Sequence, residues 1–108
     1  MAHKRRTLRF PFISSTEVIN LDFEESAYGF TKELSLFGCF VTSGVRFPQG
    51  TSVKLIIRYG GRKFESLGRV AYVLPDEGMG IVFSTTQPDD HGILESWVDE
   101  LREASAGA

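Results

Sequence analysis

Short β-rich runs, separated by turns that contain glycine or proline, follow one another along most of this chain. The clearest run is 52–59, in which apolar side chains occupy alternate positions: Val53, Leu55 and Ile57. A period of two is the signal of a half-buried strand, and the following Gly60-Gly61 pair is typical of a tight hairpin turn. Similar β-rich runs recur at 12–21, 39–42 and 79–84. Short strands at this spacing favour a small antiparallel barrel or sandwich.

The pattern changes near the C-terminus, where apolar residues recur every three or four positions. Pro88, followed by Asp89 and Asp90, is a typical helix start because acidic side chains favour the first turn. The apolar stripe predicts a helix over 88–103 that packs against the barrel: Ile93, Leu94, Trp97, Val98 and Leu101. The small residues of 104–108 are expected to fray.

Length and composition are those of a single globular domain, 1–108. With 108 residues, 42% apolar and 24% charged, the chain can bury one core and is not broadly disordered. No apolar run approaches the roughly 20 residues that cross a bilayer, so no membrane insertion is expected. The basic start lacks a signal-peptide core, and the single Cys39 excludes an internal disulfide. These features predict a cytoplasmic protein, which we expect to be a monomer or weak dimer.

The net charge of −2 conceals a strong asymmetry along the chain. Residues 1–12 carry Lys4 and three arginines and no acid, whereas residues 75–108 carry a charge of −7. A basic arm on an otherwise acidic domain indicates a localised anion site, although a solubilising tail has the same composition. The low net charge argues against bulk attraction to nucleic acid or to a membrane surface.

The side chains that carry most enzyme chemistry form no recognisable catalytic or metal-binding pattern in this sequence. Cys39 lies in an apolar run, and His3 and His91 are dozens of residues away from it. Nucleophilic catalysis needs a base beside the nucleophile, and zinc sites need closely spaced ligands. Gly78-Met79-Gly80 is too short for a phosphate-binding loop. We therefore expect no catalytic residue, no metal and no cofactor.

Two short motifs together supply the groups that recognise a guanine nucleotide. In the basic arm, Arg5 and Arg9 lie four residues apart, with Lys4 and Arg6 beside them. Guanidinium groups bind phosphate oxygens, and the O6 and N7 edge of guanine, in a bidentate way. Farther along, the segment 33–38 reads ELSLFG, which has the form acid-x-Ser-x-x-Gly. Its carboxylate can accept from guanine N1–H and N2–H, its serine can donate, and its glycine avoids a Cβ clash.

On these motifs the chain resembles the PilZ domain, a family of bacterial receptors for cyclic di-GMP. The segment RRTLR at 5–9 is similar to the family's RxxxR motif, and ELSLFG at 33–38 to its [D/N]xSxxG motif. Later segments are similar to the family's strand patterns: 47–50, 68–73 and 78–83. The resemblance covers residues 4–102 and implies an all-β fold, a six-stranded antiparallel β-barrel with a C-terminal α-helix. The expected parts are a basic ligand-binding arm at 1–12, a barrel at 13–86 and the helix at 88–103.

The resemblance also implies a function and a set of ligand-binding residues. The protein would bind cyclic di-GMP and couple binding to a conformational change that a protein partner detects. Arg5 and Arg9 would contact guanine edges and phosphates, while Glu33 and Ser35 would hold a guanine. A basic residue at Lys4 favours an intercalated pair of ligands over a single one. The expected ligand-binding set is Lys4, Arg5, Arg6, Arg9, Glu33, Ser35 and Gly38.

One position departs from the family pattern, since Glu33 stands where the motif has Asp or Asn. The extra methylene displaces the carboxylate, and a buried donor left unpaired would cost about 1–3 kcal/mol. This departure leaves open the alternative of a ligand-independent protein-interaction adaptor with the same fold. A second alternative, independent of Glu33, is a small barrel that binds RNA or single-stranded DNA. The second alternative needs aromatic platforms beside a basic groove, drawn from Phe10, Phe12, Phe37 and Phe40.

Overall fold

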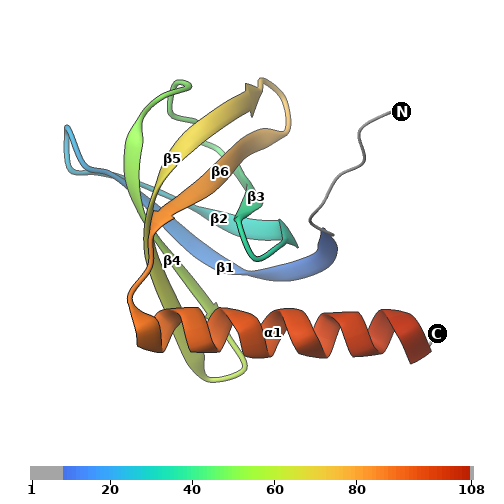
Figure 1. The fold of residues 1–108 in the computed structure, drawn as a ribbon. Coiled ribbons are helices and arrows are strands. Elements are labelled where there is room, and N and C mark those ends of the chain that lie inside the picture. The colour runs from blue at the N-terminus through green and yellow to red at the C-terminus, as the bar shows by residue number, and fades with distance from the viewer. Residues whose placement is uncertain (1–8, 108) are drawn as a thin grey trace, which may run out of the picture.

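Six β-strands precede one α-helix in this computed structural model, which describes residues 9–107 (Figure 1). The elements are β1 (Phe10–Asn20), β2 (Glu25–Leu34), β3 (Gly38–Ser43), β4 (Ser52–Tyr59), β5 (Arg62–Leu74), β6 (Gly78–Thr85) and α1 (Pro88–Gly107). The predicted strand at 52–59 and the helix start at Pro88 are confirmed.

The strands close into a barrel in the order β1-β2-β3-β6-β5-β4, and every pair is antiparallel. Closure comes from β1, which pairs with β2 on one side and with β4 on the other. Val18, for example, lies opposite Ala27 of β2 and opposite Leu55 of β4. The expected six-stranded antiparallel barrel is therefore confirmed, and the sandwich is excluded.

Two expected boundaries differ from those observed. Residues 10–12, which were assigned to the basic arm, lie in β1, where the alternation of strand positions directs Phe10 and Phe12 into the core. The helix α1 continues to Gly107, beyond the expected end at 103. The extension has a simple cause, because alanine has the highest helix propensity and recurs in this segment.

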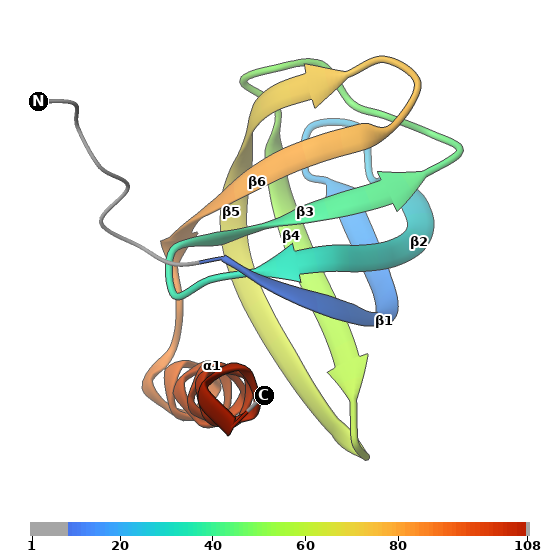
Figure 2. The same ribbon diagram turned by 90° about the vertical axis from the view of Figure 1, so that its right-hand side faces the viewer.

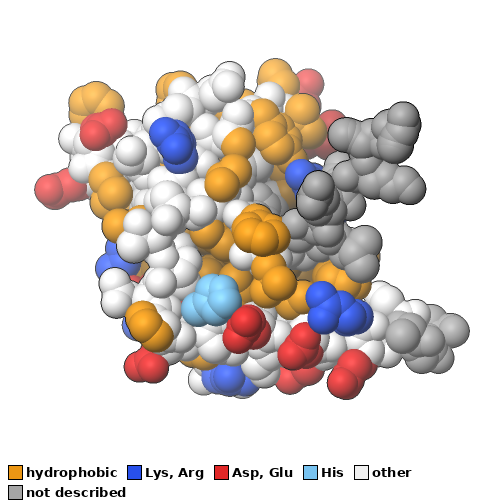
Figure 3. Space-filling view, viewed as in Figure 1, with side chains coloured by type: hydrophobic (Ala, Val, Ile, Leu, Met, Phe, Trp, Pro, Cys, Tyr) orange, Lys and Arg blue, Asp and Glu red, His pale blue; other side chains and the backbone are white. Residues whose placement is uncertain are grey.

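The helix α1 covers one end of the barrel, as the view along its axis in Figure 2 shows. Trp97 is 2% exposed and packs its ring against Phe12, Tyr59 and Phe64, with centroid distances of 5.5, 5.6 and 6.3 Å. Asp90, in the first turn of α1, accepts a 2.9 Å hydrogen bond from the backbone N–H of Glu65. The predicted apolar stripe thus belongs to the core, and acidic side chains gather along the outer side of α1 (Figure 3).

We expect Trp97→Ala to lower the free energy of unfolding by about 3–5 kcal/mol, because it empties the space between α1 and the barrel. Urea denaturation followed by circular dichroism measures this loss. The matched control is Glu100→Ala, an exposed position on the same helix, which should change stability by less than about 0.5 kcal/mol. A loss below about 1 kcal/mol for Trp97→Ala would contradict the packing role of this ring.

Candidate ligand-binding site

Two strand irregularities lie side by side at the end of the barrel where β1 begins. The register of β1 against β2 shifts between Pro11 and Ser14, and that of β2 against β3 shifts between Thr31 and Glu33. Bulges of this kind bend a strand and re-aim its side chains. They occur here immediately beside the start of the first strand, where Arg9 stands.

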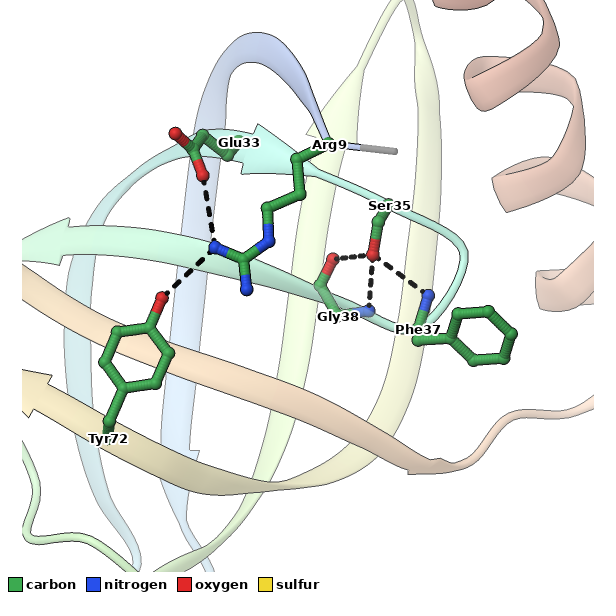
Figure 4. A network of polar contacts seen from close by, with 6 residues as sticks. All are labelled: Arg9, Glu33, Ser35, Phe37, Gly38 and Tyr72. Carbon is green, nitrogen blue, oxygen red and sulfur yellow. Dashed lines mark hydrogen bonds and ion pairs between the residues drawn. The ribbon is translucent and has the colours of Figure 1, made fainter. Parts of the chain in front are cut away.

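The guanidinium of Arg9 links two side chains that are far apart in the sequence (Figure 4). Its Nη1 lies 3.5 Å from Oε1 of Glu33 and donates to the hydroxyl of Tyr72 at 3.5 Å. The Arg9 and Glu33 side chains are about half exposed, at 43% and 49%. An ion pair with this exposure contributes little to stability, about 0–1 kcal/mol, so that its main effect is on side-chain orientation.

Beside Arg9, a row of paired residues runs across five neighbouring strands of the barrel. Pro11 pairs with Glu33, Glu33 with Phe40, Phe40 with Gly80, and Gly80 with Tyr72. Because Gly80 has no side chain, the rings of Phe40 and Tyr72 approach across it, with centroids 6.2 Å apart and planes 23° apart. The row therefore presents two nearly parallel rings beside a guanidinium and a carboxylate.

Gly80 is needed for this arrangement, since a Cβ at that position would lie 2.2 Å from the Tyr72 ring. Neither Tyr72 nor the need for glycine at position 80 was predicted from the sequence. A glycine opposite a tyrosine is a signal only when the strand register is known, and no spacing in the sequence supplies that register.

The turn between β2 and β3 is organised by Ser35, which is 6% exposed. Its hydroxyl oxygen accepts from the backbone N–H groups of Phe37 and Gly38, each at 3.1 Å, and donates to the carbonyl of Gly38 at 3.2 Å (Figure 4). The backbone N–H of Ser35 also donates to that carbonyl at 2.9 Å. In this structure the hydroxyl expected to meet a ligand holds the turn instead.

Gly38 also has a structural reason to lack a side chain. A Cβ there would lie 2.3 Å from the backbone carbonyl oxygen of Ile81 in β6, which cannot move without breaking the sheet. The absence of a side chain at Gly38 therefore allows β3 and β6 to approach each other closely.

These residues line a pocket of about 220 Å³ on the outer face of the barrel, with the following lining: Arg9, Glu33, Leu34, Ser35, Phe37, Gly38, Cys39, Phe40, Ala71, Tyr72, Gly80, Ile81 and Val82. Four residues of the expected set, Arg9, Glu33, Ser35 and Gly38, thus come together. The other three, Lys4, Arg5 and Arg6, lie outside the residues that the structure describes. Clefts and cavities that bind small ligands usually have about 300–1,000 Å³, so this pocket is small.

The thiol of Cys39 is buried, and burial raises its pKa to about 12. His91 lies at the start of α1, where its Nδ1 is 3.7 Å from Glu95. Within residues 9–107, no group of three or more His, Cys, Asp or Glu side chains is placed to hold a metal ion. No helix in this part of the chain has the length and apolar character needed to cross a membrane.

The aromatic residues considered as a nucleic-acid platform do not share one surface. Phe10 and Phe12 are buried in the core, at 6% and 3% exposure. Phe37 is 64% exposed, and Phe40 is half-buried beside Tyr72. Half of the expected platform is therefore unable to stack on bases.

The barrel has a second pocket with charged and aromatic lining, formed by Glu17, Tyr28, Phe30 and Arg58. Comparisons with known proteins identify similar structures but no similar sequences. No protein-family model matches the chain, and no curated protein matches its sequence.

Solved structures do match. The motility inhibitor MotI/DgrA of Bacillus subtilis superposes with a TM-score of 0.77 and 20% identity, over 96% of this chain and 53% of that chain. The chain therefore spans about half the length of MotI/DgrA. The PilZ domain of CeSA from a cellulose-synthesizing bacterium matches with a TM-score of 0.68 and 21% identity, over 88% and 98% of the two chains. The PilZ domain of Escherichia coli YcgR, determined with c-di-GMP, matches with a TM-score of 0.75 and 14% identity, over 95% of each.

These similarities show that the chain has the PilZ fold, as the two sequence motifs predicted. The identities lie at or below 21%. At this level of identity the comparisons show the fold alone.

We expect Cys39 to resist alkylation by iodoacetamide in the native protein at about pH 8, because only the thiolate reacts. In concentrated urea the thiol should react at the rate of a model thiol, which mass spectrometry measures. Since burial raises the pKa of this thiol from its ordinary value of 9.0 to about 12, its contribution to stability is lost as the pH rises from about 9 toward 12. Rapid native alkylation would contradict the burial.

Proposed function

We propose that this protein is a receptor for cyclic di-GMP, in which ligand binding changes the surface offered to a protein partner. The observation that carries the proposal is the meeting of Arg9, Glu33, Phe40 and Tyr72 in one pocket of a PilZ fold. Cyclic di-GMP carries two phosphates and two guanines, which are the groups that a guanidinium and aromatic rings bind. A cytoplasmic location is part of this proposal.

Arg9 is the residue to which we assign the main contact with the ligand. Both of its observed contacts involve Nη1, and neither Nε nor Nη2 has a hydrogen-bond partner among residues 9–107. Adjacent N–H groups of a guanidinium match two phosphate oxygens, or O6 and N7 of guanine. The pocket therefore holds Arg9 by one nitrogen and leaves a bidentate edge for the ligand.

The rings of Phe40 and Tyr72 give a surface on which a guanine can stack. Stacking of a base on an aromatic side chain contributes about 1–3 kcal/mol. The pocket is small, so that a ligand of this size needs further contacts, which we assign to the basic arm with Lys4, Arg5 and Arg6. Closure of that arm over the ligand would alter the surface that a partner meets. Lys4 favours a bound pair of ligands.

We expect isothermal titration calorimetry of the full chain with cyclic di-GMP to give saturable heat. Arg9→Ala should weaken binding about 10- to 100-fold, because it removes hydrogen bonds to a charged group worth about 1.5–3 kcal/mol. The matched control is Arg102→Ala, an exposed arginine of α1 that pairs with Asp99 at 3.1 Å and lies outside the pocket, which should bind within about twofold of the wild type. Equal losses in both variants would indicate non-specific electrostatics.

The alternative of a ligand-independent adaptor has one observation in its favour. Ser35 uses its hydroxyl within its own turn, and Arg9 is already paired with Glu33, so that two motif residues have partners without a ligand. Absence of heat at high micromolar cyclic di-GMP, with a cooperatively folded protein, would reject the receptor and leave the adaptor.

The second test of the pocket uses Gly80→Ala, whose Cβ would displace the Tyr72 ring from the row. We expect about tenfold weaker binding of cyclic di-GMP through lost stacking. Gly44→Ala is the matched control, since a Cβ at Gly44 meets no atom within 4 Å. Tyr72→Leu removes the ring without the clash and should give a similar loss. Binding by Tyr72→Leu at wild-type affinity would exclude the stacking role.

A further inference from the structure

We infer that Glu33 is a positioning residue for Arg9 and does not accept hydrogen bonds from the bound guanine. The inference rests on the proposed function, because it concerns how the same pocket prepares for its ligand. It gives a role to the one motif position at which this chain departs from the Asp or Asn of the PilZ pattern.

Strand register explains how a glutamate reaches Arg9. Glu33 lies directly opposite Pro11, so that Arg9, two residues earlier in the chain, is its diagonal neighbour. Diagonal neighbours lie about 7–8 Å apart, with a somewhat shorter distance between their Cβ atoms, and long side chains reach across this gap. Glu33 Oε1 comes within 3.5 Å of Arg9 Nη1. An aspartate on the same backbone would withdraw its carboxylate by about 1.5 Å, one C–C bond, and lose this contact.

The second contact of Arg9 completes the positioning. Tyr72 accepts from the same Nη1 that faces Glu33, so that two side chains from β2 and β5 hold one nitrogen from opposite directions. In the view of Figure 4, the Arg9 side chain separates Glu33 from the turn formed by Ser35 and Gly38. The carboxylate is thus directed at the guanidinium.

The energetics agree with an orienting role. An exposed ion pair of this kind contributes about 0–1 kcal/mol to folding, so that its loss leaves the barrel intact. Fixing a long arginine side chain before binding, however, removes part of the entropy that binding would otherwise lose. The glutamate therefore acts on ligand affinity through Arg9, whereas an aspartate at this position would end one C–C bond short of the guanidinium.

The two possible roles of Glu33 predict different effects of Glu33→Asp on the affinity for cyclic di-GMP. If Glu33 positions Arg9, Glu33→Asp weakens cyclic di-GMP binding about three- to tenfold, and Glu33→Gln, which keeps the length and one acceptor oxygen, weakens it less. If Glu33 is the guanine acceptor, Glu33→Asp restores the motif and binding is unchanged or tighter. Glu25→Asp is the matched control, since Glu25 is an exposed residue at the other end of β2.

A double-mutant cycle identifies the residue through which Glu33 acts. In an Arg9→Ala background, Glu33→Asp should change the affinity by less than about twofold, because the residue that it positions is gone. A full three- to tenfold loss in that background would overturn the inference, since the effect would then be independent of Arg9.

A measurement without ligand separates this inference from the proposed function. The side-chain Nε–Hε resonance of Arg9 in the NMR spectrum of the free protein should shift in Glu33→Asp and not in Glu25→Asp. If the wild type binds no cyclic di-GMP but the shift occurs, the receptor proposal fails while the contact stands. An unchanged resonance, or tighter binding by Glu33→Asp, overturns the inference.

Discussion

The pairing of β1 with both β2 and β4 is the constraint on which the rest of the molecule depends. Closure fixes an inside and an outside for every strand, because side chains alternate along each of them. The inside is filled by apolar residues and is sealed at one end by Trp97 of α1. The outside of β2, β3, β6 and β5 then becomes a continuous surface, and the pocket is a row across it.

Two bulges give this surface its local chemistry. They bend β1 and β2 at the same end of the barrel, where Arg9 leads into the first strand and Glu33 approaches the β2–β3 turn. The contacts there are long and half exposed, so that they add little to stability and act mainly on the orientation of Arg9. An arginine that is oriented before the proposed ligand arrives loses less entropy on binding.

The proposed receptor and the role assigned to Glu33 describe one arrangement. A basic side chain is held by a single nitrogen, two rings provide a stacking surface, and a tight turn ordered by Ser35 borders the pocket. The motif residues divide into those that we propose to contact the ligand and those that hold the structure around the pocket. Ser35 and Gly38 belong to the second group in this structure, since their groups are used by the turn and by β6.

The strands, the helix and the grouping of Arg9 and Glu33 in one site were predictable from the sequence, because alternation, turn residues and ordered motifs are local signals. Their direct contact was not predicted. The predicted C-terminal end of the basic arm at residue 12 was wrong. Phe10 and Phe12 belong to β1, because closure of the barrel creates the core in which both rings are buried. Tyr72 and the use of Gly80 were not predictable, because register joins residues from three strands. The sequence by itself determined the fold class and the basic and acidic motifs. Tertiary structure decided which side chains face one another, since cross-strand distances depend on closure.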